Sequence, residues 1–567
     1  MTKTPAYKHY PKRPKKLTAT FAKAEYTKLL TLLPVAEANT SPKLWIQLFR
    51  AWNALEAYTS GETCRIGYAY SKDMSDKRLE TAERYLREKI SPVIDKPEHR
   101  LVQAFLSSKH SRAVAKEFGR QLVPVYETAL KPLDPVNTSL NIKLGSLSNR
   151  YEKVLASAKI NFDGKVLNLS EIRALQYSQD TIVRQKAFRA SSEWLIKNRA
   201  KLAKIYNEQV KLRTQAGKNL GYKGYIPLAY QIRGRQNYGE SDVTAFRNSV
   251  LKNLVPLYKK IARDQARRMG QPTLKPWDVY YDPLRSIPLG TALIDKQLAN
   301  AQVVFDKLSP VLGKHFKYMR DHGLIDLETR PNKQAGAYCT IFQDEDKVAI
   351  LCNSTGDPDD VRVLTHEMGH AFQFWESQHI KAVDLQVGTA ELAEVYSMGM
   401  EFLSLPHMNE FFSKENAKKY AEYKWIDSIF TICYVCVVDE FQHWVYKNPD
   451  ASLERRDKSW AKLYAKYLPF VDFSGSEKYL SVRWYAQRHI FAAPFYYIDY
   501  ALAETSAMQL GLLAAKDHAN TMKKYLKMCR IGGTKGFLEA LDYADLKSPF
   551  DEDLIISIAK EAEKILL

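Results

Sequence analysis

Apolar residues recur every three or four positions along most of this 567-residue chain, as they do on one face of an α-helix. Strict alternation of apolar and polar residues, which is typical of half-buried strands, is scarce. The pattern predicts helices over Phe21–Leu33, Leu44–Tyr58, Arg78–Ile90, Arg100–Lys109, Leu147–Ala158, Gln185–Gly217, Val243–Met269 and Leu293–Leu312. The expected fold class is therefore mainly α.

Two short β-prone runs interrupt the helical pattern. They cover Gly336–Phe342 and Val348–Cys352, and the acidic segment Gln343–Lys347 joins them. Runs of β-branched and aromatic residues on either side of a polar turn predict a hairpin. We therefore expect a small pair of antiparallel strands directly before the next helix.

That next helix carries the motif His366-Glu367-Met368-Gly369-His370. Histidines four positions apart lie one turn apart on the same helix face, so both imidazoles can reach one zinc ion. The glutamate between them can act as general base on a water at that ion. Two hydrogen-bonded core histidines would produce the same pattern, so a third ligand is needed to decide between the two interpretations.

A second helix downstream offers carboxylates for the third ligand. Thr389 is placed to cap a helix over Ala390–Leu403, and Glu391, Glu394 and Glu401 share one face of it. Carboxylates among apolar neighbours are costly to bury unless a cation or hydrogen bonds compensate them. Glu391 and Glu401 are candidates for orienting the two histidines, and solvation or helix pairing is the alternative role for both.

Three positions near the motif limit the alternatives. Gln373 and Glu376 stand where a metzincin site would have glycine and histidine, so the third ligand is expected on a separate helix. Gly369 costs a helix interior about 1 kcal/mol relative to alanine. Either another backbone, such as that of the predicted hairpin, approaches this glycine closely, or the residue is a neutral accident.

Composition narrows the class of protein. The net charge is +20 and the first residues are basic, but no basic cluster with interleaved aromatics is present, so specific nucleic-acid binding is not expected. No apolar signal core and no membrane-spanning run is found, which predicts no membrane partner and a cytoplasmic location. Cys433 and Cys436 form a C-x-x-C inside an apolar run, which favours core cysteines over a redox or metal site.

Taken together, the motifs resemble a known family. H-E-M-G-H-A-F begins at His366, and Glu394 of E-V-Y-S-M-G-M-E-F follows 24 residues after the second histidine. G-A-Y-C-T from Gly336 and I-L-C-N from Ile350 precede the motif, and H-I-F-A-A-P-F-Y-Y-I-D-Y from His489 follows it. This arrangement resembles the thimet oligopeptidase and oligoendopeptidase F family of zinc peptidases over at least residues 336–500.

The resemblance implies a two-lobed helical ellipsoid with a deep substrate channel and one zinc ion at its floor. It implies that His366, His370 and Glu394 bind the zinc ion and that Glu367 is the general base. It also implies that an edge strand beside the zinc helix pairs with the substrate backbone. The residues implied for that substrate contact are Gly336, Ala337 and Tyr338.

The resemblance further implies a catalytic group downstream. His489 matches a histidine near the reacting carbonyl, and the tyrosines that follow it match the group that stabilises the oxyanion. We assign catalytic roles to Tyr497 and Tyr500 and substrate binding to Tyr496. The segment before these tyrosines is shorter than in thimet-type enzymes and contains Pro494, so the three tyrosines remain alternatives for the oxyanion contact.

The expected function is a zinc-dependent endo-oligopeptidase acting on short unstructured peptides. A dipeptidyl carboxypeptidase on the same scaffold and a catalytically inactive peptide-binding protein are the alternatives. The expected organisation is a flexible basic tail at 1–20, an N-terminal helical lobe at 21–215 and a catalytic helical region at 216–567. The oligomeric state is left open.

Overall fold

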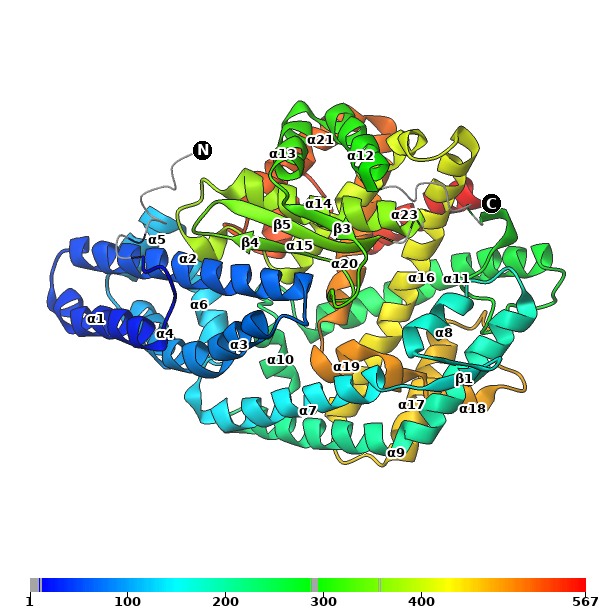
Figure 1. The fold of residues 1–567 in the computed structure, drawn as a ribbon, viewed down its shortest axis with the longest axis horizontal. Helices are drawn as coiled ribbons and strands as arrows, with labels where there is room; N and C mark the ends of the chain where they lie inside the picture. The colour runs from blue at the N-terminus through cyan, green and yellow to red at the C-terminus, as the bar shows by residue number, and fades with distance from the viewer. Residues whose placement is uncertain (1–9, 11–12, 286, 288–293, 355, 357) are drawn as a thin grey trace. The chain divides into compact units, whose positions relative to one another are not determined.

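The computed structural model describes residues 10, 13–285, 287, 294–354, 356 and 358–567. Helices dominate it, and the strands form one two-stranded and one three-stranded sheet (Figure 1). The expected mainly α class is confirmed. In the part of the chain that the structure describes, no helix combines the length and apolar character needed to cross a membrane.

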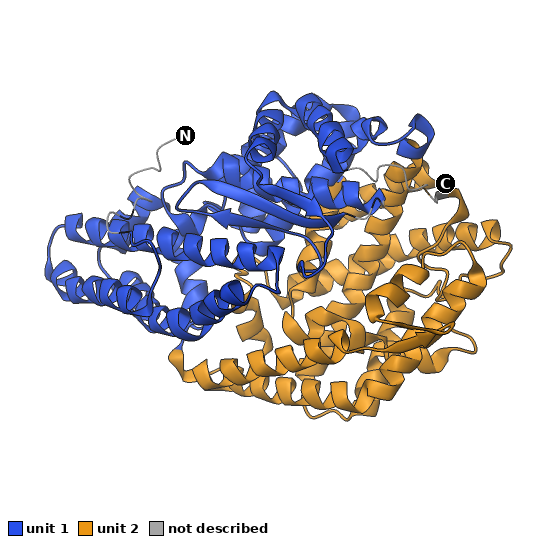
Figure 2. Cartoon of the chain, in the orientation of Figure 1, with its two compact units in different colours: residues 1–134, 288–417, 509–548 blue, residues 135–287, 418–508, 549–567 orange. Residues whose placement is uncertain are grey.

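The chain forms two compact units (Figure 2). Unit 1 comprises Met1–Asp134, Pro288–Ala417 and Gln509–Ser548, and unit 2 comprises Pro135–Ile287, Lys418–Met508 and Pro549–Leu567. Both units therefore take residues from each side of the boundary expected between residues 215 and 216. Two of the boundaries between the units fall inside continuous helices, namely α16 (Lys414–Lys447) and α20 (Tyr497–Lys516). No proline- or glycine-rich linker marks either boundary in the sequence.

Unit 1 contains two groups of helices. The first is α1 (Ala19–Ala38), α2 (Lys43–Lys72), α3 (Lys77–Tyr85), α4 (Ser91–Ser107), α5 (Ser111–Phe118) and α6 (Leu122–Leu130). The second is α12 (Ile294–Leu308), α13 (Pro310–Asp321), α14 (Pro358–Ser377), α15 (Ala390–Ser404), α21 (His518–Ile531) and α22 (Phe537–Tyr543). The first group encloses a core rich in aromatic side chains, including Trp45, Phe49, Trp52 and Phe105.

The first helix illustrates how the sequence produces these elements. The Thr18 hydroxyl accepts a hydrogen bond from the backbone N–H of Phe21, which caps the N-terminus of α1. Buried residues at Ala22, Tyr26, Leu29 and Leu33 then follow at spacings of three and four. Part of the expected flexible tail lies outside the described residues. Within the described part, Tyr10 stacks on Tyr58 and Arg13 pairs with Asp344.

The three-stranded sheet of unit 1 contains the predicted hairpin. Strands β4 (Tyr338–Phe342) and β5 (Lys347–Ser354) pair antiparallel, with Tyr338 opposite Leu351. Strand β3 (Ile325–Glu328), which the hydrophobic pattern did not predict, pairs parallel on the other side of β5. The order β3-β5-β4 makes β4 an edge strand, and α14 contacts both β4 and β5 while α2 contacts β4.

An ion-pair group fastens the hairpin turn to α2. Arg65 donates two hydrogen bonds to Asp344, at 2.7 and 3.0 Å, and one to Glu345 at 2.9 Å. Asp344 is almost fully buried and also pairs with Arg13. Bidentate arginine–carboxylate contacts of this kind fix geometry as well as adding stability. The position of β4 therefore depends on residues nearly 280 positions earlier in the chain.

Unit 2 combines long helices with several short ones. These are α7 (Thr138–Ala156), α8 (Leu169–Leu175), α9 (Thr181–Asn219), α10 (Ile226–Ile232), α11 (Glu240–Arg268), α16 (Lys414–Lys447), α17 (Leu453–Tyr467), α18 (Glu477–Leu480), α19 (Arg488–Ala492), α20 (Tyr497–Lys516) and α23 (Glu552–Leu566), with the hairpin β1 (Ile160–Phe162) and β2 (Lys165–Leu167). The predicted helix Leu293–Leu312 is divided between α12 and α13, because Ser309 is extended and caps α13. Leu293 lies outside the described residues.

Candidate metal centre

The two motif histidines lie on α14, whose buried stripe holds the helix in place. Val361, Leu364, Met368 and Phe372 are buried, and α14 packs against the sheet, α15 and α21. The imidazoles of His366 and His370 are only partly covered, with side-chain exposures of 17% and 22%. The helix therefore anchors itself through one stripe and leaves the histidine face accessible to a small ligand.

Glu394 of α15 completes a triad of candidate ligands. Its Oε2 lies 3.4 Å from Nε2 of His366 and 3.7 Å from Nε2 of His370. One donor atom from each of the three residues lies within 4.8 Å of the others. A tetrahedral zinc ion with bonds of about 2.0–2.1 Å has its donors about 3.4 Å apart. The spacing and the chemistry of this donor set therefore fit zinc.

Hydrogen bonds orient the candidate ligands. Nδ1 of His366 lies 2.7 Å from Oε1 of Glu401, so an N–H at Nδ1 donates to the carboxylate and Nε2 is the ring nitrogen that faces the triad. His370 is hydrogen-bonded to the backbone of Ala393, and the hydroxyl of Ser397 donates to Oε2 of Glu394. Contacts of this kind fix the tautomer and ring orientation of metal-binding histidines.

The other carboxylates near the motif are also buried or paired. Glu401 is 4% exposed and Glu391 is 1% exposed, so solvation is excluded as the role of either. Glu401 takes the orienting position, while an orienting role for Glu391 stays a prediction. Glu376 pairs with Arg530 and His315, which agrees with a third ligand on a separate helix. Thr389 is the N-cap of α15, although its side chain makes no capping hydrogen bond.

Gly369 allows α15 to approach α14 between the two histidines. A Cβ atom at this position would lie 2.5 Å from the carbonyl oxygen of Tyr396 and 2.7 Å from Cα of Ser397. Both contacts are shorter than side chains tolerate, so only glycine fits here. The close backbone is that of α15 rather than that of the hairpin, and the glycine is not a neutral accident.

Glu367, the predicted general base, is almost fully buried. It is 6% exposed, and its Oε2 is buried with no hydrogen-bond partner among the residues that the structure describes. Burial raises its pKa to about 7. Burial also raises the pKa of Cys339 on β4, and the charge of Glu367 adds to that shift, which indicates that the carboxylate is close to the edge strand. A buried carboxylate with an unused oxygen is a costly arrangement unless another molecule uses it.

Burial and the neighbouring carboxylates together set the protonation of the two histidines. Burial opposes protonation of His366, but hydrogen bonds and charges from Glu394 and Glu401 outweigh it and raise its pKa to about 10. Burial lowers the pKa of His370 to about 4. His370 is therefore neutral, as a metal ligand must be, and His366 would release its proton at Nε2 when a cation binds.

The predicted substrate strand begins slightly later than expected. Gly336 and Ala337 precede β4, which starts at Tyr338. Gly336 has a φ of +93°, and its carbonyl accepts a hydrogen bond from the side-chain amide of Asn353 at 2.8 Å. Gly336 therefore forms the turn into the edge strand rather than part of the strand itself.

The downstream candidates form one aromatic cluster in unit 2. His489 stacks on Tyr496 with ring centroids 6.0 Å apart, and it lies 4.7 Å from Tyr497 and 5.8 Å from Tyr500. The rings of Tyr496 and Tyr500 meet edge to face at 5.1 Å. Burial raises the pKa of Tyr497, which keeps its phenol protonated and able to donate. All four side chains are partly exposed.

A sharp turn precedes these tyrosines, and residues absent from the sequence-based predictions hold it. Phe495 adopts a φ of +61°, which is uncommon for a bulky residue. Its N–H donates to the side chain of Gln442 at 2.9 Å, and its carbonyl accepts from Arg235, which is paired with Asp499 at 2.7 Å. Contacts spanning some 260 residues leave no local signal, so the sequence could not reveal them.

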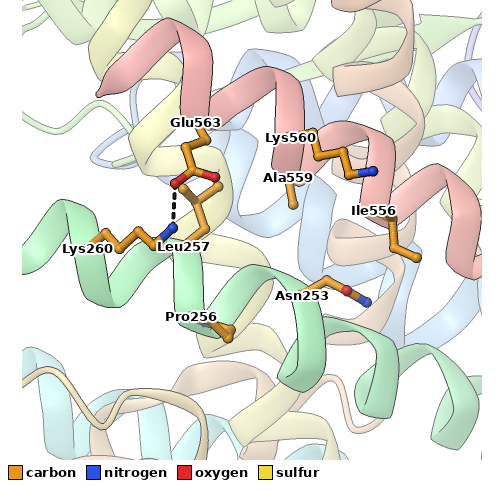
Figure 3. Close-up of a pocket in the computed structure, with 8 residues that line it drawn as sticks. All are labelled: Asn253, Pro256, Leu257, Lys260, Ile556, Ala559, Lys560 and Glu563. Carbon is orange, nitrogen blue, oxygen red and sulfur yellow. Dashed lines mark hydrogen bonds and ion pairs between the residues drawn. The ribbon is translucent and has the colours of Figure 1, made fainter.

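Two pockets lie elsewhere on the surface. One lies between α11 and α23, where Lys260 pairs with Glu563 (Figure 3). The other is lined mainly by α21. None of the predicted site residues lines either pocket, and the donor chemistry of the histidine–glutamate triad is the stronger indicator of function.

Cys433 and Cys436 are fully buried on α16.

Two family models match most of the chain. The family model for peptidase family M3 matches residues 174–560, and the model for the peptidase M3 N-terminal domain matches residues 14–133. The comparison with curated proteins found no match.

Three solved structures cover nearly the whole chain. A PZ peptidase A with inhibitor 2 and a putative oligoendopeptidase F are each 31% identical, with a TM-score of 0.89, and cover 98% of this chain and 97% of theirs. A putative oligoendopeptidase F from Bacillus anthracis str. Ames is 29% identical, with a TM-score of 0.86, and covers 99% of this chain and 98% of its own. The chain belongs to peptidase family M3.

Proposed function

We propose that this M3 peptidase is a zinc-dependent endo-oligopeptidase that cleaves internal bonds of short unstructured peptides. The observation that carries the proposal is the triad of His366, His370 and Glu394, with Glu367 beside it holding an unused buried oxygen. A protein that only binds peptides has no need for this unpaired carboxylate. The similarity to oligoendopeptidase F structures supports the same class of reaction.

The residues of the chain suggest how the reaction proceeds. When bound by the triad, zinc would act as a Lewis acid that activates a water molecule and polarises the scissile carbonyl. Glu367 accepts the proton of the attacking water and delivers it to the leaving amine. General base work of this kind typically accelerates a reaction by about 10²–10⁴-fold. One of Tyr496, Tyr497 and Tyr500 donates a hydrogen bond to the developing oxyanion.

The edge strand β4 supplies the remaining element of the proposal. Only one of its edges is paired with a described strand, so the other edge offers backbone donors and acceptors to an extended peptide. Binding through backbone groups accepts many sequences but requires an unfolded segment. This requirement predicts a preference for short peptides over folded proteins.

Replacement of the general base tests the proposal. Glu367→Gln is nearly isosteric and leaves the metal ligands intact, so it is expected to bind zinc as the wild type does and to lose at least about 99% of turnover on a quenched peptide of about ten residues. Glu376→Gln, a glutamate on the same helix with an ion-pair partner, serves as the matched control and is expected to remain active. Wild-type turnover by Glu367→Gln would refute the assignment.

Two further measurements separate the proposal from its alternatives. Elemental analysis is expected to find about one zinc per chain, and removal of that zinc by a chelator is expected to abolish cleavage. Mass spectrometry of the products is expected to show internal cuts. Release of C-terminal dipeptides alone would identify a dipeptidyl carboxypeptidase, and tight binding without cleavage by the zinc-loaded protein would identify an inactive peptide-binding protein.

A further inference from the structure

The arginines of unit 2 differ in whether the protein supplies them with a countercharge. Buried ion pairs join Arg184 to Asp278, Arg235 to Asp499 and Arg247 to Asp439. Arg233 precedes Arg235 by only two residues, yet no carboxylate or carbonyl partner for its guanidinium is found among the residues that the structure describes. A charged group left without a partner in a half-buried position calls for an explanation.

The position of Arg233 is well defined. It is the C-cap of α10, directly before Gly234, and its side chain is half-buried. Its Nε atom is buried and has no hydrogen-bond partner in the described part of the chain. The guanidinium carbon lies 5.4 Å from the centre of the Tyr496 ring. Contact with an aromatic ring orients an arginine without consuming its hydrogen-bond donors.

The ring beneath Arg233 belongs to the aromatic cluster already described. Tyr496 stacks on His489 with an angle of 7° between the ring planes, and the guanidinium of Arg233 contacts the same Tyr496 ring. Asp499, two residues after Tyr497 in α20, is already paired with Arg235. Arg233 therefore presents a positive group, whose Nε–H has no partner in the described part of the chain, beside the residues assigned to substrate binding and catalysis.

The chemistry of the guanidinium indicates the ligand. Arginine offers a planar fork of N–H donors that matches the two oxygens of a carboxylate, and such charge-assisted pairs are among the strongest hydrogen bonds in proteins. A short peptide carries a carboxylate at its C-terminus and on every aspartate or glutamate. A neutral backbone group would satisfy a donor but would leave the charge of Arg233 uncompensated.

We propose that Arg233 is a subsite for a carboxylate of the peptide substrate, supplied either by the free C-terminus or by an acidic side chain. The inference rests on the proposed peptidase function and narrows its substrates to peptides that place a carboxylate at this position. Tyr496 acts as the support that orients the guanidinium. Arg233 thus determines specificity rather than the rate of the chemical step.

Peptide binding to the zinc-loaded Glu367→Gln variant tests the proposal without turnover. The probes are fluorescein-labelled peptides of about ten residues: a neutral sequence ending in an amide, the same sequence ending in a free acid, and amidated versions with glutamate at one position at a time. Fluorescence anisotropy is expected to find about tenfold tighter binding for at least one acidic form than for the neutral amide. The form preferred identifies the source of the carboxylate.

Added substitutions then assign the preference to one residue. Arg233→Met keeps the apolar stem and is expected to remove the tenfold preference while leaving binding of the neutral amide unchanged. Arg233→Lys keeps the charge without the planar fork and is expected to retain part of the preference. Arg263→Met, which removes an exposed arginine of α11, is the control and is expected to change neither affinity.

Each other outcome overturns the proposal. The proposal is refuted if no acidic peptide is preferred, or if the preference survives Arg233→Met. It is also refuted if Arg233→Met weakens binding of every peptide equally, because that result would reveal a structural role. Failure of the proposed function is a separate result. It would appear as a wild-type protein that keeps the binding preference and cleaves no peptide, whereas cleavage without any charge preference would refute the Arg233 subsite alone.

Discussion

Substitution of Gly369 by alanine tests whether the close approach of α14 and α15 creates the metal site. The added Cβ would lie 2.5 Å from the Tyr396 carbonyl oxygen, whereas ordinary contacts begin at about 3.4 Å. The backbones must therefore separate locally by about 0.9 Å. Because the obstructing atoms belong to a helix backbone, no side-chain rotation can relieve the clash.

Two opposing effects determine the stability of this variant. Overpacking in a tight core costs about 1–3 kcal/mol, and replacing a helical glycine by alanine returns about 1 kcal/mol. We therefore expect a net loss of up to about 2 kcal/mol. The larger effect is expected on metal binding. Glu394 lies two residues before Tyr396 on the displaced helix, and metal–ligand distances can deviate by only about 0.2 Å from their usual values. Zinc affinity is expected to fall by about tenfold or more.

The assay combines zinc competition against a chromophoric chelator with thermal unfolding of the metal-free protein. Gly145→Ala is the matched control, since Gly145 lies at an exposed position of α7 and a Cβ there would meet nothing within 4 Å. That variant is expected to gain up to about 1 kcal/mol in stability and to bind zinc normally. Wild-type zinc affinity together with unchanged stability in Gly369→Ala would refute the reasoning.

Two further predictions concern carboxylates in unit 1. Glu401→Gln keeps an acceptor for Nδ1–H of His366 but removes the negative charge. Competition with a chelator should therefore show about tenfold weaker zinc binding. An unchanged zinc affinity would contradict the orienting role of Glu401. Burial and the charge of Asp384 raise the pKa of Glu98 to about 7. Between this value and the ordinary pKa of 4.5, the folded protein therefore holds a proton that the unfolded chain has released. The free energy of unfolding consequently falls as the pH rises through this range. Urea unfolding of Glu98→Gln should show a gain over the wild type at pH 8 that shrinks at pH 5, and an equal difference at both pH values would exclude this cause.

The sequence by itself determined the features that depend on neighbouring residues. Helical periodicity marked the positions of most long helices, and β-prone runs around an acidic turn predicted the hairpin of β4 and β5. The spacing of His366 and His370 places both on one helix face wherever that helix lies in the fold. The pattern of carboxylates on the next helix brought Glu394 into consideration in the same way.

Only the tertiary structure decided which of these groups meet. It showed that α15, rather than the hairpin, occupies the space that Gly369 leaves, and that the carboxylate of Glu401 is hydrogen-bonded to His366 instead of facing solvent. It also revealed strand β3 and the support of Phe495 by Arg235, neither of which has a local signature.

The physical reason is the range of the interactions. Backbone geometry fixes the spacing of residues a few positions apart, so the sequence predicts helices, strands and the face on which a side chain lies. Contacts between residues tens or hundreds of positions apart exist only when packing repays the entropy of closing the intervening chain. For that reason the ligand types were evident from the sequence. Their convergence within 4.8 Å, and the absence of a countercharge for Arg233 among the described residues, were established by the fold.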